Sequence, residues 1–481
     1  MANVEKTSVQ RVMESSTGLK RTLKTRDAIM VGVGGTIGTG LFLSSGDVLS
    51  GAGPGGTIVA YLLGGFFIWL MISCLGEMSS AMPVSGTTQA YATEFVNPAM
   101  GFTIGWVNWI AAAITITAQI VASSIIMKNI APNTPTIMWV LIFAALLFGA
   151  NFFSVKSYGN VSFYFASLKL VLVVAFIIIG TLMIFGVGTG HAVGLTNFTN
   201  NGGLFPNGMG GISSVILSAF YAFGGIEMVA CTAGEIEKEK DIPKSINTTI
   251  ILLVVIYIVC SFVLAALLPW NQADLNGSPF AYVFSNAGIN GAALIVNIIV
   301  LTSALTSGNY FVYACTRYLW SISKFGQAPK FVSKTTKKGV PIVALCISMA
   351  FAVFGVASQY IAADTVYLFL IYLIGGGNIF HYTLVCVCQI RFRRRFIKEG
   401  GNVADLNYKV LKFPLIPIMG ICAFMLVLVM TLSNKSQWIP MAICYTCYAL
   451  MYIGFSLYSK RKSKRAEALE NDAIDNNNDA A

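Results

Sequence analysis

The chain has 481 residues, of which 56% are hydrophobic and only 11% are charged, with a mean hydropathy of +0.73 and a formal net charge of +11. This composition is far too apolar for a soluble domain. It predicts an all-α membrane protein that crosses the bilayer many times.

Twelve apolar segments follow one another along the chain, and a spanning helix needs about 20 mostly apolar residues. The segments lie near residues 28–49, 57–82, 98–127, 137–153, 159–186, 209–233, 245–270, 288–316, 341–358, 365–389, 414–433 and 439–459. We therefore expect a segment 1–27, a transmembrane domain 28–459 and a tail 460–481. No removable signal peptide is expected, because a polar stretch without a small-residue cleavage site precedes the first segment.

The first segment contains a glycine-rich run from Val31 to Gly40, in which half of the residues are glycine. Each glycine costs about 1 kcal/mol against alanine inside a helix, so the run predicts an unwound stretch between two half-helices. Bare backbone at membrane depth is tolerated only where it lines a cavity or is buried in protein. The amides that open a half-helix attract a carboxylate, so the run is a candidate ligand site. The alternative is close packing of helices through small residues.

A second interruption is expected at Gly224 and Gly225, inside the sixth segment. If segments one to five and six to ten are two repeats, both interruptions occupy corresponding places. Such a pair points to a binding site near the membrane midplane of a transporter built from inverted repeats. Segments eleven and twelve would then be additions to the two repeats.

Glu227, directly after the second interruption, and Lys169, in the fifth segment, are ionisable side chains inside apolar segments. An ionisable residue at that depth is a candidate functional residue, so both are candidates for proton coupling. Structural roles are the alternatives. Glu227 could brace the unwound backbone through hydrogen bonds, and Lys169 could extend to the cytoplasmic edge of the membrane.

The basic residues follow a strongly one-sided pattern across the twelve segments. With the N-terminus inside, 28 of the 31 Lys and Arg residues fall in cytoplasmic stretches, while Lys128 and Lys435 fall outside and Lys169 falls within a segment. The positive-inside rule therefore predicts that both termini are cytoplasmic, and no nucleic-acid partner is needed to explain the net charge. The run Arg391–Arg395 is expected to be a cytoplasmic stop, with binding of anionic lipid as the weaker alternative.

Other polar residues of the apolar segments are weaker signals, because such residues more often form interhelical hydrogen bonds. These residues are Asn108, Gln119, Thr302, Ser303, Thr306, Ser307 and Asn309. Glu77 and Glu94 flank the loop after the second segment and are expected to be solvated or paired with bases of the loops. Cysteines in the apolar segments are expected to pack in the core, and the two histidines form no cluster with acids. We therefore expect no metal, no cofactor and no enzymatic function.

Six short motifs occur in order along the chain. They are Gly35–Phe42, Ala52–Gly55, Leu75–Met78, Met82–Gly86, Ala233–Glu235 and Gly326–Lys330. Together they resemble the amino acid permeases of the amino acid–polyamine–organocation superfamily, in its bacterial amino acid transporter branch. The resemblance extends from Leu23 to Leu457. Lysine permeases look most similar, through Thr39–Phe42, Asn133–Pro135 and Asp405–Tyr408.

This resemblance implies a leucine-transporter-like fold with broken first and sixth helices. The repeats would span about 28–186 and 209–389, and the two extra helices about 414–459. The substrate carboxylate would meet amides of the first interruption, and the α-amino group would meet carbonyls of the sixth helix. The implied binding residues are Thr36, Ile37, Gly38, Thr39, Gly40, Tyr221, Ala222, Phe223, Gly224 and Glu227.

The resemblance also implies roles for individual side chains. Tyr221 would cap the site, Glu227 matches an acid implicated in proton sensing, and Lys169 matches a lysine that takes the place of a sodium ion in proton-coupled relatives. We therefore expect a transporter of the cell membrane that takes up an L-amino acid with a proton, a cationic one such as lysine being favoured. An exchanger, a channel and a non-transporting amino acid sensor are the alternatives. Residues 460–481 are expected to form a disordered tail.

Overall fold

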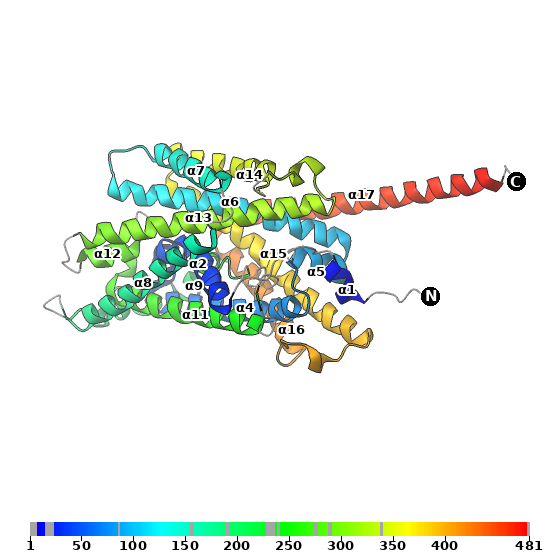
Figure 1. Ribbon diagram of the computed structural model, residues 1–481. Helices are drawn as coiled ribbons and strands as arrows, with labels where there is room; N and C mark the ends of the chain where they lie inside the picture. The colour runs from blue at the N-terminus through cyan, green and yellow to red at the C-terminus, as the bar shows by residue number, and fades with distance from the viewer. Residues whose placement is uncertain are drawn as a thin grey trace.

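The computed structural model describes residues 7–14, 24–84, 87–153, 158–187, 192–227, 236–237, 241–273, 278–286, 291–336 and 340–478. Its longer helices are α2 (Thr25–Thr36), α4 (Ser44–Ala81), α6 (Pro98–Ile130), α7 (Thr136–Phe153), α8 (Tyr158–Ile184), α9 (Gly208–Ala222), α11 (Ile242–Leu267), α13 (Ala292–Lys324), α15 (Ala363–Lys398), α16 (Leu415–Met430) and α17 (Trp438–Asn478). Shorter helices are α1 (Ser8–Glu14), α3 (Thr39–Phe42), α5 (Thr87–Phe95), α12 (Pro279–Asn286) and α14 (Ile342–Met349). Figure 1 shows an elongated bundle, with α1 and the end of α17 at the same end.

Every apolar segment expected from the sequence contains helix. Within the described residues, eight helices are long and apolar enough to cross a membrane, namely α4, α6, α8, α11, α13, α15, α16 and α17. Shorter apolar helices at Thr136–Phe152, Gly208–Ala222 and Ile342–Ser358 occupy the fourth, sixth and ninth segments. The first segment is shared between α2, α3 and the beginning of α4.

The first two segments are joined by a kink inside α4. Gly53 has φ +73° and ψ 177°, and Pro54 follows it. A side chain on Gly53 would need a left-handed conformation and would place its Cβ 2.3 Å from Cδ of Pro206. Proline at the next position has no N–H to continue the helical bonding, so the chain changes direction here without a loop.

Two apolar cores fill the bundle. The larger one contains Phe223 and Tyr257 and joins α4, α9, α11 and α15. The smaller one contains Trp109, Leu147 and Leu345 and joins α6, α7, α13 and α14. Ile37 and Phe223, at the two helix interruptions, belong to the larger core.

Glu77 is wholly buried and therefore not solvated, and the base with which it pairs, Arg393, lies on helix α15 and not in a loop. Its carboxylate accepts hydrogen bonds from the guanidinium of Arg393, from Nε2 of Gln389 at 3.0 Å and from the amide of Val410 at 2.6 Å. Arg393 lies on the inward face of α15 and is only 6% exposed. The ion pair thereby ties α4 to α15 and to the loop that follows it.

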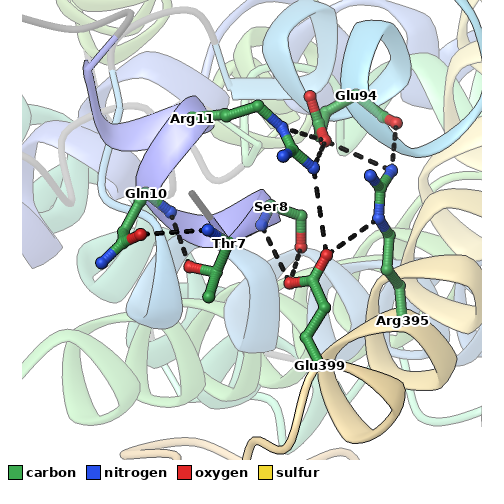
Figure 2. Close-up of polar contacts among 7 residues, drawn as sticks. All are labelled: Thr7, Ser8, Gln10, Arg11, Glu94, Arg395 and Glu399. Atoms are coloured by element: carbon green, nitrogen blue, oxygen red, sulfur yellow. Dashed lines mark hydrogen bonds and ion pairs between the residues drawn. The ribbon is translucent and has the colours of Figure 1, made fainter. Parts of the chain in front are cut away.

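The short helix α1 is fastened to the rest of the bundle by a polar network (Figure 2). The amide and hydroxyl of Ser8 both donate to Oε2 of Glu399 at 2.8 Å, and the guanidinium of Arg11 pairs with Glu94 at 2.8 Å. Arg395 pairs with Glu399 at 3.0 Å and with Glu94 at 3.2 Å. The network joins α1 to α5 and to the last turn of α15.

The C-terminal tail departs from the expectation of disorder. Helix α17 continues without a break from its apolar part to Asn478, and Figure 1 shows this part extending beyond the bundle. The first ten residues after Lys460 include two Arg, two Lys, two Ala, two Glu and one Leu, which are strong helix formers. The free energy needed to continue the helix past Lys460 is therefore lower than the acidic composition of the tail alone suggests.

Candidate functional site

The first predicted interruption is present. Helix α2 ends at Thr36 and α3 begins at Thr39, so Ile37 and Gly38 lie outside both helices. Among the described residues, the amides of Gly38, Thr39 and Gly40 donate no hydrogen bond within the protein. Three free N–H groups at the start of a half-helix suit a carboxylate.

Lys169 fastens this interruption to α8 and α13. Its ammonium donates to the carbonyl of Gly34 at 2.8 Å, to the carbonyl of Ile37 at 2.9 Å and to the hydroxyl of Ser307 at 3.0 Å. The residue is only 3% exposed, which rules out extension of the side chain to the membrane edge. An ammonium has three N–H bonds, and here each one meets an oxygen atom.

The second predicted interruption begins where α9 ends at Ala222. The chain then turns, and Gly225 has φ +98°, a conformation that favours glycine. Residues 228–235, which include most of the second half of the sixth segment, lie outside the described residues. Glu227 accepts hydrogen bonds from the amide of Gly225 at 3.2 Å and from the hydroxyl of Tyr382 at 3.3 Å, so it does brace the unwound backbone.

The two interruptions touch each other. A Cβ on Gly40 would lie 2.5 Å from Cα of Ala222, so the backbones of α3 and α9 are in contact. The hydroxyl of Tyr257, on α11, donates to the carbonyl of Ala222 at 2.6 Å and also lies 3.4 Å from the carbonyl of Thr36. One phenol therefore bonds to both interruptions.

A cavity lies between the interruptions and helices α6, α13 and α15. Its cavity volume, taken as the space open to the centre of a water-sized molecule, is about 40 Å³. Its lining is Gly35, Thr36, Gly40, Asn108, Ala111, Ala112, Thr115, Gln119, Tyr221, Gly224, Gly225, Glu227, Phe311, Ala314, Tyr318, Ile374, Asn378 and His381. Half of the ten predicted binding residues are among them, namely Thr36, Gly40, Tyr221, Gly224 and Glu227.

The other five predicted binding residues lie beside the cavity and do not line it. They are Ile37, Gly38, Thr39, Ala222 and Phe223. The ring of Phe223 points into the larger core, where it packs against Tyr257 at 4.7 Å between ring centroids. The hydroxyl of Thr39 is hydrogen-bonded to that of Tyr221 at 3.0 Å, so it positions the aromatic ring that faces the cavity.

Tyr221 joins three elements on one side of the cavity. Besides Thr39, its hydroxyl accepts a hydrogen bond from Nε2 of Gln119 at 3.3 Å. Its ring meets the ring of Tyr367 edge to face, with centroids 6.2 Å apart. The Tyr367 hydroxyl in turn donates to the carbonyl of Thr39 at 3.3 Å. The role of Tyr221 as the cap of a bound substrate stays a prediction.

Sequence reasoning missed the polar wall that α15 contributes. Ile374, Asn378 and His381 all line the cavity, and their spacing of four and three residues puts them on one helix face. His381 is hydrogen-bonded through Nε2 to the hydroxyl of Thr88 at 2.9 Å. The spacing of these residues predicts that they share one face of the helix. It does not predict whether that face points into the cavity or toward the lipid.

Asp47 is a second missed candidate. It lies near the start of α4, one turn beyond Ser44, and accepts a short hydrogen bond from the hydroxyl of Ser218 on α9. Its other electrostatic neighbours are the phenols of Tyr61, Tyr367 and Tyr372. Within the described residues no cation pairs with it. The rule that singled out Glu227, an acid inside an apolar segment, applies equally to Asp47.

The charges around the cavity are sparse and mainly acidic. Glu227 is the one carboxylate among the lining residues, and no Lys or Arg is among them. Lys169 lies behind the first interruption, with its ammonium directed at backbone oxygens. Free amides at one edge and a carboxylate on the wall can accommodate a small molecule that carries charges of both signs.

Comparison with known proteins agrees with this geometry. Residues 27–467 match the family model described as amino acid permease. The chain is 40% identical over 463 residues to a putative histidine permease of Bacillus subtilis (strain 168), which covers 95% of this chain and 96% of that protein.

Two further relatives carry other names. The lysine-specific permease LysP of Lactococcus lactis subsp. cremoris (strain MG1363) is 36% identical over 480 residues, or 94% of each chain. The gamma-aminobutyric acid permease of Bacillus subtilis (strain 168) is 34% identical over 458 residues, which is 95% of this chain and 97% of that protein. The matches extend over nearly the whole length of both partners. The chain therefore belongs to the amino acid permease family, whose members are membrane transporters and not enzymes.

Proposed function

We propose that this protein takes up a cationic amino acid together with a proton across the cell membrane by alternating access. The substrate would lie in the cavity between the two interruptions. Rocking of one five-helix repeat against the other would open that cavity to each side in turn. In this proposal both termini are cytoplasmic, as the distribution of basic residues indicates.

The α-carboxylate of the substrate would bind at the first interruption. The free amides of Gly38, Thr39 and Gly40 support this assignment, because N–H groups at a helix start stabilise an anion. Of these three residues, Gly40 lines the cavity and the other two lie directly before it in the chain. The α-amino group would meet carbonyl groups at the end of α9. The carbonyl of Ala222 already accepts from Tyr257, which leaves the carbonyl of Gly224 as the better partner.

The bonding of Lys169 is the main support for proton coupling. Three oxygen atoms lie 2.8–3.0 Å from its nitrogen. A neutral amine has only two N–H bonds, so it could keep at most two of these three donated hydrogen bonds. Loss of the proton would therefore loosen the tie between the first interruption and α13, which is how a proton could be linked to movement of the half-helices. Glu227 is the second candidate for coupling.

Acidic groups support the preference for a cationic substrate. Glu227 lies on the cavity wall, and Asp47 lies outside the lining, in the first turn of α4, with the hydroxyl of Ser218 on α9 as its hydrogen-bond donor. A side-chain ammonium or guanidinium would find these carboxylates without competing with a lysine or arginine of the cavity lining. A neutral amino acid would gain nothing from either of them.

Uptake of radiolabelled amino acids into proteoliposomes of the purified protein tests this proposal. Saturable uptake of lysine, arginine or histidine that is driven by an imposed inward proton gradient and abolished by a protonophore is the expected result. Neutral amino acids should be poorer substrates.

Other outcomes would contradict parts of the proposal. Uptake that requires preloaded internal amino acid would identify an exchanger, and uptake driven by sodium alone would exclude Lys169 as the coupling group. Flux that never saturates would indicate a channel. Binding of an amino acid without any flux would indicate a sensor.

A further inference from the structure

The last turns of α15 carry four cations on one helix face. Arg391, Arg394, Arg395 and Lys398 follow one another at intervals of three, one and three residues, which places them side by side along the helix. Together with Phe95 and Glu399 they line a groove of about 600 Å³. Its remaining wall is formed by α5, on which Phe95 lies.

This groove contains most of the basic run but not all of it. Arg393 points to the opposite face of α15, where Glu77 neutralises it in the interior. The four groove cations face a single lining carboxylate, that of Glu399. The basic run is therefore divided between one buried structural cation and a strongly positive open groove.

The groove cations differ in how firmly they are held. Arg395 is fixed between Glu94 and Glu399, as Figure 2 shows, and Arg391 donates to the carbonyl of Phe95 at 3.3 Å. Arg394 is exposed, and so is Lys398 one turn farther along. Neither of these two side chains has a hydrogen-bond or ion-pair partner in the part of the chain that the structure describes. The groove therefore contains two guanidinium groups that protein contacts hold in place, those of Arg391 and Arg395. Beside them are two cations, Arg394 and Lys398, whose N–H groups bond to none of the described residues.

The groove lies at the end of a helix that is long enough to pass through both headgroup layers. Helix α15 has 36 residues, so at 1.5 Å per residue it is about 54 Å long, longer than a bilayer of about 40–45 Å with its headgroups. The chain turns back after α15 and starts the next apolar helix at Leu415. Leu411 and Leu415 are 68% and 50% exposed, as expected where protein meets the membrane boundary.

We propose that this groove binds the phosphate headgroup of an anionic phospholipid. Planar guanidinium groups match the oxygen atoms of a phosphate in pairs, and basic pockets at the ends of membrane helices suit anionic headgroups. Arg391 and Arg394 would contact the phosphate, and Lys398 would contribute its charge at the outer end. This site is separate from the substrate cavity, and no residue is shared between the two linings.

Binding of phosphatidylglycerol to the purified full chain tests the proposal. The protein is reconstituted in phosphatidylcholine nanodiscs, and phosphatidylglycerol is titrated in and counted by native mass spectrometry. In the double variant Arg394→Gln/Lys398→Gln the affinity should fall by about 25-fold, since each basic residue near an anionic headgroup contributes about fivefold, or ~1 kcal/mol. The control Lys330→Gln/Lys334→Gln removes two exposed charges from another loop and should bind like the wild type.

Two results would overturn the assignment. Equal affinity in both double variants would mean that the cations serve only to orient the chain and to complement the helix end. Displacement of the lipid by millimolar inorganic phosphate, or phosphate binding with the same dependence on Arg394 and Lys398 in detergent alone, would make the ligand a soluble phosphate compound. Neither measurement depends on transport, so the outcome is independent of the proposed function.

Discussion

Replacement of Glu77 by glutamine should be severely destabilising. Oε1 of Glu77 accepts from Arg393 Nε at 2.8 Å and from Gln389 at 3.0 Å, while Oε2 accepts from the amide of Val410 at 2.6 Å and from a second nitrogen of Arg393. A glutamine has one oxygen and one NH2 group, so in either orientation two of these donors face another donor. Arg393 also loses its counter-charge while it stays buried.

The expected loss is about 3–5 kcal/mol, the usual cost of removing one partner of a buried ion pair. The double variant Glu77→Met/Arg393→Met removes both charges and should cost far less, because apolar residues of similar volume can replace such a pair. Glu94→Gln removes an ion-pair partner that is 19% exposed, near the same end of α15, and should cost below about 1 kcal/mol.

Thermal unfolding of the purified variants in detergent, followed by tryptophan fluorescence, ranks their stabilities through their melting temperatures. We expect Glu77→Gln to melt lowest, with the double variant well above it and Glu94→Gln close to the wild type. A Glu77→Gln protein that melts with the wild type would refute the buried pair. So would a double variant that is less stable than the single one.

Four further substitutions test the site and the docked N-terminal helix. Lys169→Ala should abolish accumulation driven by a proton gradient and retain some exchange, as measured in proteoliposomes. Gly38→Val should abolish substrate binding in a scintillation proximity assay, because its Cβ would lie 2.8 Å from a serine hydroxyl of α13 where backbone must approach a carboxylate. Asp47→Asn should raise KM for a cationic substrate by about tenfold, or ~1.4 kcal/mol, and leave a neutral one unchanged. Partial burial opposes ionisation of Glu399, but bonds from α1 and a neighbouring guanidinium outweigh it and hold its pKa below 4.5. Its contribution to docking is therefore complete above pH 4.5 and lost as the pH falls below that value, which a spin label at Gln10→Cys would report as increased mobility.

Each of these predictions has a control. Gly149→Ala adds a side chain where nothing lies within 4 Å and should bind normally, whereas normal affinity in Gly38→Val would refute the placement of the carboxylate. Asp364→Asn changes an acid elsewhere and should leave KM unaltered; an equal change there would remove the special role of Asp47. Unchanged accumulation in the Lys169 variant would exclude that residue from coupling. Label mobility that depends on pH equally in Glu399→Gln would exclude Glu399 as the titrating group.

The helix interruptions could be predicted because their cause is local. Clustered glycine weakens a helix wherever it occurs, and Gly38 and Gly225 both lie in non-helical backbone. Their partners could not be predicted, because Ser307 follows Lys169 by 138 residues and Arg393 follows Glu77 by 316. Such pairs exist only after the helices have packed.

The weaker polar signals illustrate the same limit. Asn108 and Gln119 do line the cavity. Ser307 and Ser303 instead support the first interruption through the carbonyl of Ile37. All four are polar residues inside apolar segments, and the sequence offers no way to tell which helix face looks into the cavity. The direction in which each side chain points, and not the residue type, determines which of the four line the cavity.

The phenol of Tyr257 offers a direct way to watch this protein work. Because its hydroxyl lies between the carbonyls of Ala222 and Thr36, any separation of the two broken helices must change the surroundings of this one ring. A fluorine atom introduced beside that hydroxyl would give a single magnetic resonance signal sensitive to the separation. Titration with amino acids could then reveal how many arrangements of the helices exist, and how fast they exchange, in a protein that is not moving any substrate.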